Sequence, residues 1–161
     1  MTHIRKAIPE DRQVIIKYVS DMIGGSDRVE VAVKEVDKFF QQSCYSVYIA
    51  EVDSIPIGFE SVKNDSIEGA DAVSEIVFTY IDDKHRRKGA GSELVRGIEL
   101  DVKNQGIQKL YTKVNVSNIR AACFWISQGY QFESRLLRLN QGIDYYVLVL
   151  QRNIRGRQRI E

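Results

Sequence analysis

The chain has 161 residues, enough for one domain with at most a short tail. Lys and Arg number 23 against 22 Asp and Glu, and this net charge of +1 argues against a dedicated nucleic-acid binder. With 43% hydrophobic and 28% charged residues, the composition is that of a globular protein, which excludes a disordered chain, collagen and a coiled coil.

Nothing in the sequence indicates a membrane segment or a metal centre. No apolar run approaches the roughly 20 residues that cross a bilayer. The N-terminus lacks the apolar stretch of a signal peptide. Cys44 and Cys123 lie far apart without the spacing of a zinc site. We therefore expect a cytoplasmic protein with no membrane partner and no metal.

The first part of the chain predicts a strand and two helices. A short strand over 2–8 leads to a helix that begins at Pro9 and ends at Gly24-Gly25. The stretch 28–42 also alternates valines with charged residues, as a strand would, but its length favours a helix.

Further along, strands and helices alternate. The patterns predict strands over 45–52, 57–63, 72–81, 107–116, 130–138 and 145–150, and helices over 89–104 and from Asn118 to Gly129. The order β-α-α-β-β-β-α-β-α-β-β is that of an α/β (α+β mixed sheet) fold. The crossover between 72 and 116 makes its two strands parallel, while the hairpins around it make the sheet mixed.

We expect one domain over 1–151 and a basic tail over 152–161, which carries four arginines. Three interpretations of the tail stay open: a solvated arm, a contact with nucleic acid, or a segment that rests on the domain or on a partner subunit.

A basic turn before the predicted helix at 89–104 has the chemistry of an anion site. The run Lys84 to Lys88 is followed by Gly89-Ala90-Gly91 at the start of the helix. A helix N-terminus offers unpaired N–H groups and partial positive charge, and glycines let a ligand approach them closely. The glycine spacing is that of neither a P-loop nor a dinucleotide fold. A solvated turn without a ligand remains the alternative.

Two motifs on these elements resemble the GNAT superfamily of acyl-CoA-dependent N-acetyltransferases. Arg86-x-x-Gly89-x-Gly91 is similar to the family's pyrophosphate signature. The stretch Asn118-x-x-Ala121-x-x-Phe124-Trp125-x-x-x-Gly129-Tyr130 is similar to its second motif. The resemblance covers nearly the whole chain. It implies a GNAT-like fold, with a central mixed sheet of about seven strands flanked by about four helices.

The resemblance also implies where acetyl-CoA binds. The loop from Arg86 to Gly91, with Ser92, holds the pyrophosphate, and the strand edge at 79–81 pairs with the pantetheine arm. Asn118 is either a cofactor contact or a plain helix cap, and Trp125 is either core or cofactor wall. The implied cofactor-binding residues are Thr79, Tyr80, Ile81, Arg86, Arg87, Lys88, Gly89, Ala90, Gly91, Ser92, Asn118 and Trp125.

Glu75 is the expected general base. It stands in an otherwise apolar strand and precedes Arg86 by eleven positions, like the catalytic glutamate of the histone-modifying branch. An acceptor amine is mostly protonated at neutral pH, so attack on a thioester needs a base. The alternative is a glutamate on the polar side of the strand. We expect the N–H of Tyr80 to polarise the carbonyl oxygen.

The general acid is where the sequence departs from the family. Trp125 takes the place of a common tyrosine, and an indole N–H cannot protonate a thiolate as a phenol can. Tyr130, Tyr145 and Tyr146 are unranked substitutes, and unassisted departure of the thiolate is the other option.

The acceptor is expected to be an amine of a small molecule, peptide or protein, bound between the Gly24-Gly25 loop, the second helix and the turn at 140–144. A homodimer is common in the family. Two alternatives remain: a non-catalytic acyl-CoA-binding module, and a nucleic-acid-associated protein acting through its tail. Acids that could attract a cationic amine are Asp27, Glu30, Asp65, Glu68 and Asp71.

Overall fold

The computed structural model describes residues 2–64 and 72–151. The predicted tail over 152–161 and three of the predicted acceptor-site acids, Asp65, Glu68 and Asp71, lie outside them.

The described segments form seven strands and four α-helices in the predicted order. The strands are β1 (His3–Lys6), β2 (Tyr45–Val52), β3 (Ile55–Lys63), β4 (Val73–Ile81), β5 (Lys109–Asn115), β6 (Gln131–Asn140) and β7 (Ile143–Gln151). The α-helices are α1 (Arg12–Ile23), α2 (Val29–Gln41), α3 (Ala90–Asn104) and α4 (Ile119–Ser127), with short 3-10 turns η1 (Pro9–Asp11), η2 (Ser26–Arg28) and η3 (Asp83–His85).

All seven strands belong to one mixed sheet in the order β1-β2-β3-β4-β5-β7-β6. Every neighbouring pair is antiparallel except β4 and β5, which α3 connects as a parallel crossover. The β2–β3 hairpin closes through Asp53 and Ser54, both with positive φ, as a turn that matches the twist of the strands requires. The predicted fold class is confirmed.

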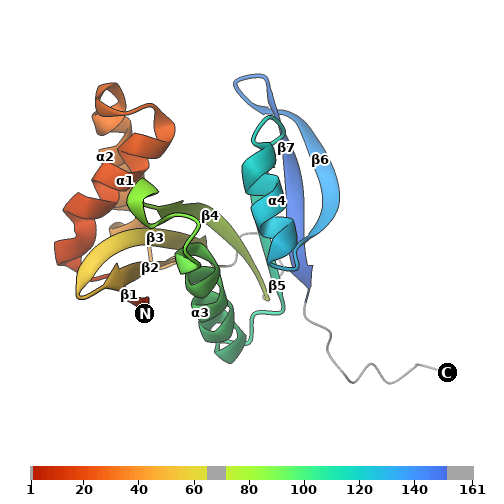
Figure 1. Ribbon diagram of the computed structural model, residues 1–161. Helices are drawn as coiled ribbons and strands as arrows, with labels where there is room; N and C mark the ends of the chain where they lie inside the picture. The colour runs from red at the N-terminus through yellow and green to blue at the C-terminus, as the bar shows by residue number, and fades with distance from the viewer. Residues whose placement is uncertain (1, 65–71, 152–161) are drawn as a thin grey trace.

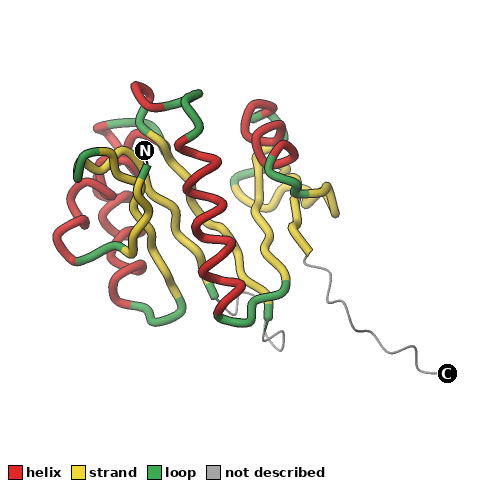
Figure 2. The backbone as a smooth tube through the Cα atoms, turned by 60° about the horizontal axis from the view of Figure 1, so that its bottom comes forward, coloured by secondary structure: helices red, strands yellow, loops and turns green. Residues whose placement is uncertain are grey.

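Helices cover both faces of the sheet and make two cores (Figures 1 and 2). On one face α1 and α2 bury Ile15, Val19 and Val36 against Phe59 of β3. On the other face α3 and α4 pack over the strands through a larger apolar cluster that includes Trp125. The sheet thus stands between the two helix layers, with β4 and β5 next to each other at its centre.

The buried face of α2 is not the one that the alternating valines suggest. Ala32, Val36 and Phe39 are buried, at helical spacing. Val29 lies before this buried stripe, which begins at Ala32, and is 43% exposed. The strand-like alternation of Val29 with Val31 thus records two exposed residues in the first turn of the helix.

Candidate active site

The sheet opens into a fork between β4 and β5. The two strands pair in parallel only from Val73 with Lys109 to Ile76 with Thr112. Beyond that point residues 78–81 pair with β3 alone, after a register shift that skips Val77, and β4 and β5 diverge in Figure 1. The Thr112 hydroxyl donates a hydrogen bond of 3.1 Å to the Ile76 carbonyl, which satisfies a buried acceptor where the strands part. The fork therefore exposes one edge of β4 within the sheet.

The ladder between β3 and β4 fixes which N–H groups face the fork. The Asp82 N–H donates to the Ile57 carbonyl, so the antiparallel pair two residues back, Phe59 with Tyr80, also exchanges hydrogen bonds. The Tyr80 N–H therefore points to β3, and the expectation that it polarises a substrate carbonyl is wrong. The N–H groups of Thr79 and Ile81 face the fork instead.

The loop between β4 and α3 has the backbone of an anion cradle. Arg87 and Gly89 both have positive φ, of 59° and 89°, and α3 begins at Ala90. Such a turn directs successive N–H groups outward, next to the unpaired N–H groups of the first helical turn. Gly91 lies against the Phe124 ring of α4, where an added Cβ would meet ring carbons at 3.4 Å. These residues fit an oxyanion group, with Ser92 half-buried in the first turn.

The basic side chains of this loop have different partners. The Arg86 side chain contacts β4. Its Nε donates to the Ile81 carbonyl at 2.6 Å, and its guanidinium lies 5.2 Å from the Tyr80 ring centroid. Arg86 also forms an ion pair with Asp83. Arg87 is exposed and lies three residues before α3 begins.

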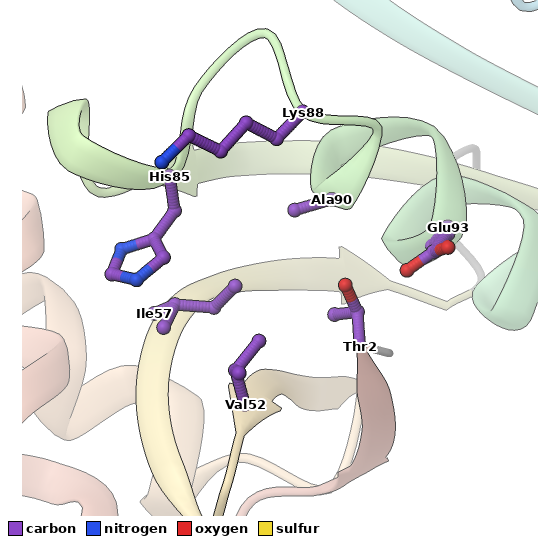
Figure 3. A pocket seen from close by; sticks show the side chains of 7 residues that line it. All are labelled: Thr2, Val52, Ile57, His85, Lys88, Ala90 and Glu93. Carbon is purple, nitrogen blue, oxygen red and sulfur yellow. The ribbon is translucent and has the colours of Figure 1, made fainter.

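Lys88 and Ala90 border a hollow next to the N-terminus of α3, which Figure 3 shows from close by. The Lys88 ammonium donates to the Lys84 carbonyl at 2.8 Å. The hollow has a volume of about 310 Å³ and is floored by residues of the β2–β3 hairpin, whereas Gly91 faces α4. Its lining consists of Thr2, Val52, Ile57, His85, Lys88, Ala90 and Glu93.

Glu75 lies at the base of the fork and is 9% exposed. Its Cα partner on β5 is Tyr111, whose hydroxyl donates a hydrogen bond of 3.0 Å to Oε2. The Lys113 ammonium forms an ion pair of 2.7 Å with Oε1. Sequence reasoning missed both partners, because they become neighbours of Glu75 only through the register of two strands far apart in the chain.

The second motif builds a helix start and part of the core. The Asn118 side chain accepts the Ala121 N–H at 3.1 Å, so it caps α4. Trp125 is 5% exposed, and its ring packs at 4.8 Å from that of Tyr130. Trp125 is therefore a core residue in this structure.

The three tyrosines proposed as acids lie on different sides of the sheet. Tyr130 is 1% exposed in the core under α4. Tyr146 pairs with the inward-facing Val114 and packs on Phe132. Tyr145 pairs with Asn115, and strand alternation places it on the face of the sheet that carries Glu75. Of the three, Tyr145 shares a face with the predicted base.

A second carboxyl group, which the sequence did not indicate, is buried beside the open edge. Glu60 of β3 is fully buried and accepts a hydrogen bond of 2.9 Å from the Thr79 hydroxyl. Burial raises the pKa of Glu60 to about 8, the Thr79 hydrogen bond opposes that rise, and the negative charge of Glu99 adds to it. This rise favours the protonated, neutral form of the Glu60 carboxyl at neutral pH.

The segments expected to form the acceptor pocket stand on either side of the fork. The α1–α2 loop and the β6–β7 turn both lie at the end toward which the fork opens (Figure 1). Asp27 is in η2 and Glu30 in the first turn of α2, and both are exposed.

The described segments contain neither a cluster of metal ligands nor a membrane-spanning helix. Within residues 2–64 and 72–151, no group of three or more His, Cys, Asp or Glu side chains is arranged to hold a metal ion. None of the helices described is both long and apolar enough to cross a bilayer.

Comparison with known proteins assigns the chain to a family. The family model described as "Acetyltransferase (GNAT) family" matches residues 17–130. The chain belongs to this family. The matched region contains both motifs and the fork, so the resemblance found in the sequence is confirmed. Among curated proteins none matches the chain.

Solved structures share the GNAT fold at low sequence identity. A GNAT-family protein from Desulfovibrio desulfuricans has a TM-score of 0.80 and 18% identity, over 94% of this chain and 99% of that one. A ribosomal-protein-alanine N-acetyltransferase from Brucella melitensis has a TM-score of 0.77 and 17% identity, over 92% and 99%. The PaiA N-acetyltransferase from Thermoplasma acidophilum, solved in complex with coenzyme A, has a TM-score of 0.70 and 18% identity, over 94% and 99%.

Proposed function

We propose that this GNAT chain is an N-acetyltransferase that moves an acetyl group from acetyl-CoA to a primary amine of a small molecule, peptide or protein. Glu75 acts as the general base in a direct attack of the amine on the thioester. The observation that carries the proposal is the position of the Glu75 carboxyl at the base of the β4–β5 fork, whose open edge leads toward the anion cradle at α3.

Acetyl-CoA is assigned to the fork by its chemistry. A pyrophosphate suits the outward N–H groups of residues 87–91. We assign the exposed Arg87 as a positive charge beside it and Ser92 as a hydroxyl donor. The amides of a pantetheine arm suit an unpaired strand edge, where Thr79 and Ile81 present their N–H groups. Asn118 and Trp125 are assigned supporting roles, the first as the cap of α4 and the second as the residue by which α4 packs into the core.

Proton removal from the acceptor is the task of Glu75. An alkyl ammonium with a pKa of about 10.4 is neutral in only about one molecule in a few thousand at pH 7. The Glu75 carboxyl accepts the proton as nitrogen attacks the thioester carbon, and the carbon–sulfur bond then breaks to release the thiolate. The Tyr111 hydroxyl orients the carboxyl from the β5 side.

One second candidate has an observation in its favour. Trp125 is buried at the position where many family members have a tyrosine. In addition, the Glu75 carboxylate already forms an ion pair with Lys113. A non-catalytic acyl-CoA-binding module would tolerate both features. It predicts binding of acetyl-CoA with no acetylation of any amine.

The Glu75→Gln variant separates the two candidates. Release of the CoA thiol is followed with a panel of amines and peptides, and binding of acetyl-CoA is followed by calorimetry. We expect turnover to fall roughly 10²- to 10⁴-fold with unchanged affinity for acetyl-CoA, because the base acts only in the chemical step. Glu133→Gln, a substitution on exposed β6, is the matched control and leaves both quantities unchanged. Turnover in Glu75→Gln equal to that of the wild type contradicts the role of the base.

A further inference from the structure

The fork places one lysine of the chain itself against the proposed base. Lys113 is the first β5 residue beyond the last pair that β5 makes with β4, which is Thr112 with Ile76. Its side chain shares a face with Tyr111 and Glu75, because side chains alternate along a strand. The Lys113 Nζ lies 2.7 Å from Glu75 Oε1, and the Lys113 side chain is 33% exposed.

This arrangement is that of an amine substrate already in contact with its base. An external acceptor must bring its ammonium to the Glu75 carboxyl, and Lys113 holds that position in the structure. The strand edge assigned to the pantetheine arm, residues 79–81, lies beyond the last β4–β5 pair, as Lys113 does on β5. An acyl group carried along that edge toward Glu75 therefore approaches the Lys113 nitrogen as well.

We propose that Lys113 is a site of self-acetylation, an inference that rests on the proposed function. The Lys113 ammonium gives a proton to the Glu75 carboxylate, and its nitrogen then forms a bond with the acetyl carbon. The nitrogen loses its second proton to solvent, the tetrahedral carbon collapses to the amide as its bond to sulfur breaks, and the thiolate of CoA takes the proton that Glu75 accepted. Acetyl-CoA and the lysine ammonium are thus converted to CoA, N-acetyl-lysine and one proton.

The modification changes what Glu75 can do. An acetylated lysine carries no charge and donates through a single amide N–H, so the ion pair with Glu75 is lost. The Tyr111 hydroxyl still holds the other carboxylate oxygen. The carboxylate is then open to the ammonium of an external acceptor, so one acetylation event at Lys113 activates the enzyme for later turnovers.

Lys109 is a matched internal control, because it lies on the same strand with almost the same exposure. Its side chain is 31% exposed, and its ammonium pairs with Glu133 of β6 at 2.8 Å. It stands where β4 and β5 are still paired, opposite Val73, and not in the fork. Uncatalysed acetylation by the thioester would modify both lysines alike, whereas the proposed reaction selects Lys113.

The test uses the purified full chain with acetyl-CoA. Intact mass spectrometry measures the gain of one acetyl group, and peptide mapping assigns it. We expect Lys113 to be acetylated at least tenfold faster than Lys109, with a rate constant that does not change on dilution, as for a reaction within one chain. Lys113→Arg abolishes the mass gain, Glu75→Gln slows it, and Lys109→Arg leaves it unchanged.

Several outcomes overturn the inference, and one of them also overturns the proposed function. Equal rates at the two lysines, or unaltered acetylation of Lys113 in Glu75→Gln, rule out a directed reaction in the fork. Unmodified Lys113 in a protein that acetylates free amines overturns self-acetylation and leaves the proposed function intact. Failure of the wild-type chain to bind acetyl-CoA in calorimetry overturns the proposed function itself.

Discussion

Glu60 makes the stability of this protein depend on pH in a direction opposite to that of a paired surface carboxylate. The side chain is fully buried beneath α3, with one oxygen bonded to Thr79 and the other, Oε1, lacking a hydrogen-bond partner among the residues described. Burial raises the pKa of Glu60 from an ordinary 4.5 to about 8. The folded chain therefore holds a proton that the unfolded chain has already released over this range.

The sign and size of the effect follow from proton linkage. Between pH 4.5 and about pH 8 the folded state binds more protons than the unfolded state, so the free energy of unfolding falls as the pH rises. The slope is about 1.4 kcal/mol per pH unit, which gives about 5 kcal/mol over the whole range. Domains are stable by only about 5–15 kcal/mol, so an effect of this size is readily measured.

Glu60→Gln is the perturbation that isolates this effect. Glutamine has nearly the shape of the protonated acid but cannot ionise, so the variant lacks the Glu60 contribution to the pH profile. We expect the variant to gain about 4 kcal/mol relative to the wild type between pH 5 and pH 8, from the same slope. Urea unfolding followed by circular dichroism at several pH values gives both free energies.

The control is Glu133→Gln on the exposed strand β6. Glu133 makes a surface ion pair with Lys109, whose contribution to stability is about 0–1 kcal/mol. The free energy of unfolding of Glu133→Gln is therefore expected to stay close to that of the wild type at every pH. Parallel pH profiles for Glu60→Gln and the wild type would show that Glu60 is not a buried neutral acid and would refute the reasoning.

Two further predictions concern the cradle and the acid. Gly89→Ala and Gly106→Ala both add a Cβ in open space at positive φ, so each is expected to lower the free energy of unfolding by about 1 kcal/mol. Only Gly89→Ala is expected to weaken the binding of acetyl-CoA, which calorimetry measures. Equal affinities would place the anion elsewhere. Tyr145→Phe is expected to lower turnover by roughly tenfold or more, while Tyr146→Phe, on the opposite face, leaves it unchanged. Equal rates in the two variants would exclude Tyr145 as the acid.

The element order could be predicted because its signals are local. Turn residues such as Asp53-Ser54, the cap at Asn118 and the glycine after α4 each act within a few positions of the chain. The glycine-opened start of α3 was visible for the same reason, since its motif is short and contiguous. Glu75 was chosen from its apolar strand and its spacing from Arg86, and its role as the base stays a prediction. Trp125 was expected to be either core or cofactor wall; its side chain is buried in the core, and a contact with the cofactor stays a prediction.

The partners of Glu75 could not be predicted, since they depend on pairing between distant strands. Tyr111 and Lys113 meet Glu75 only because β4 and β5 align Glu75 with Tyr111. The direction of the Tyr80 N–H depends on the phase of the β3–β4 ladder, where a one-residue change reverses every N–H. The burial of Glu60 likewise depends on how α3 packs over β3.

The central claim is that acetyl-CoA binds along the β4 edge that the fork exposes. Amide hydrogen exchange of the full chain, resolved by NMR at residues 77–81 with and without acetyl-CoA, tests it directly. We expect the Thr79 and Ile81 amides, which face the fork, to gain protection on binding, while the Tyr80 amide, already bonded to β3, keeps its rate. Unchanged exchange at Thr79 and Ile81 in a chain saturated with acetyl-CoA would contradict the claim.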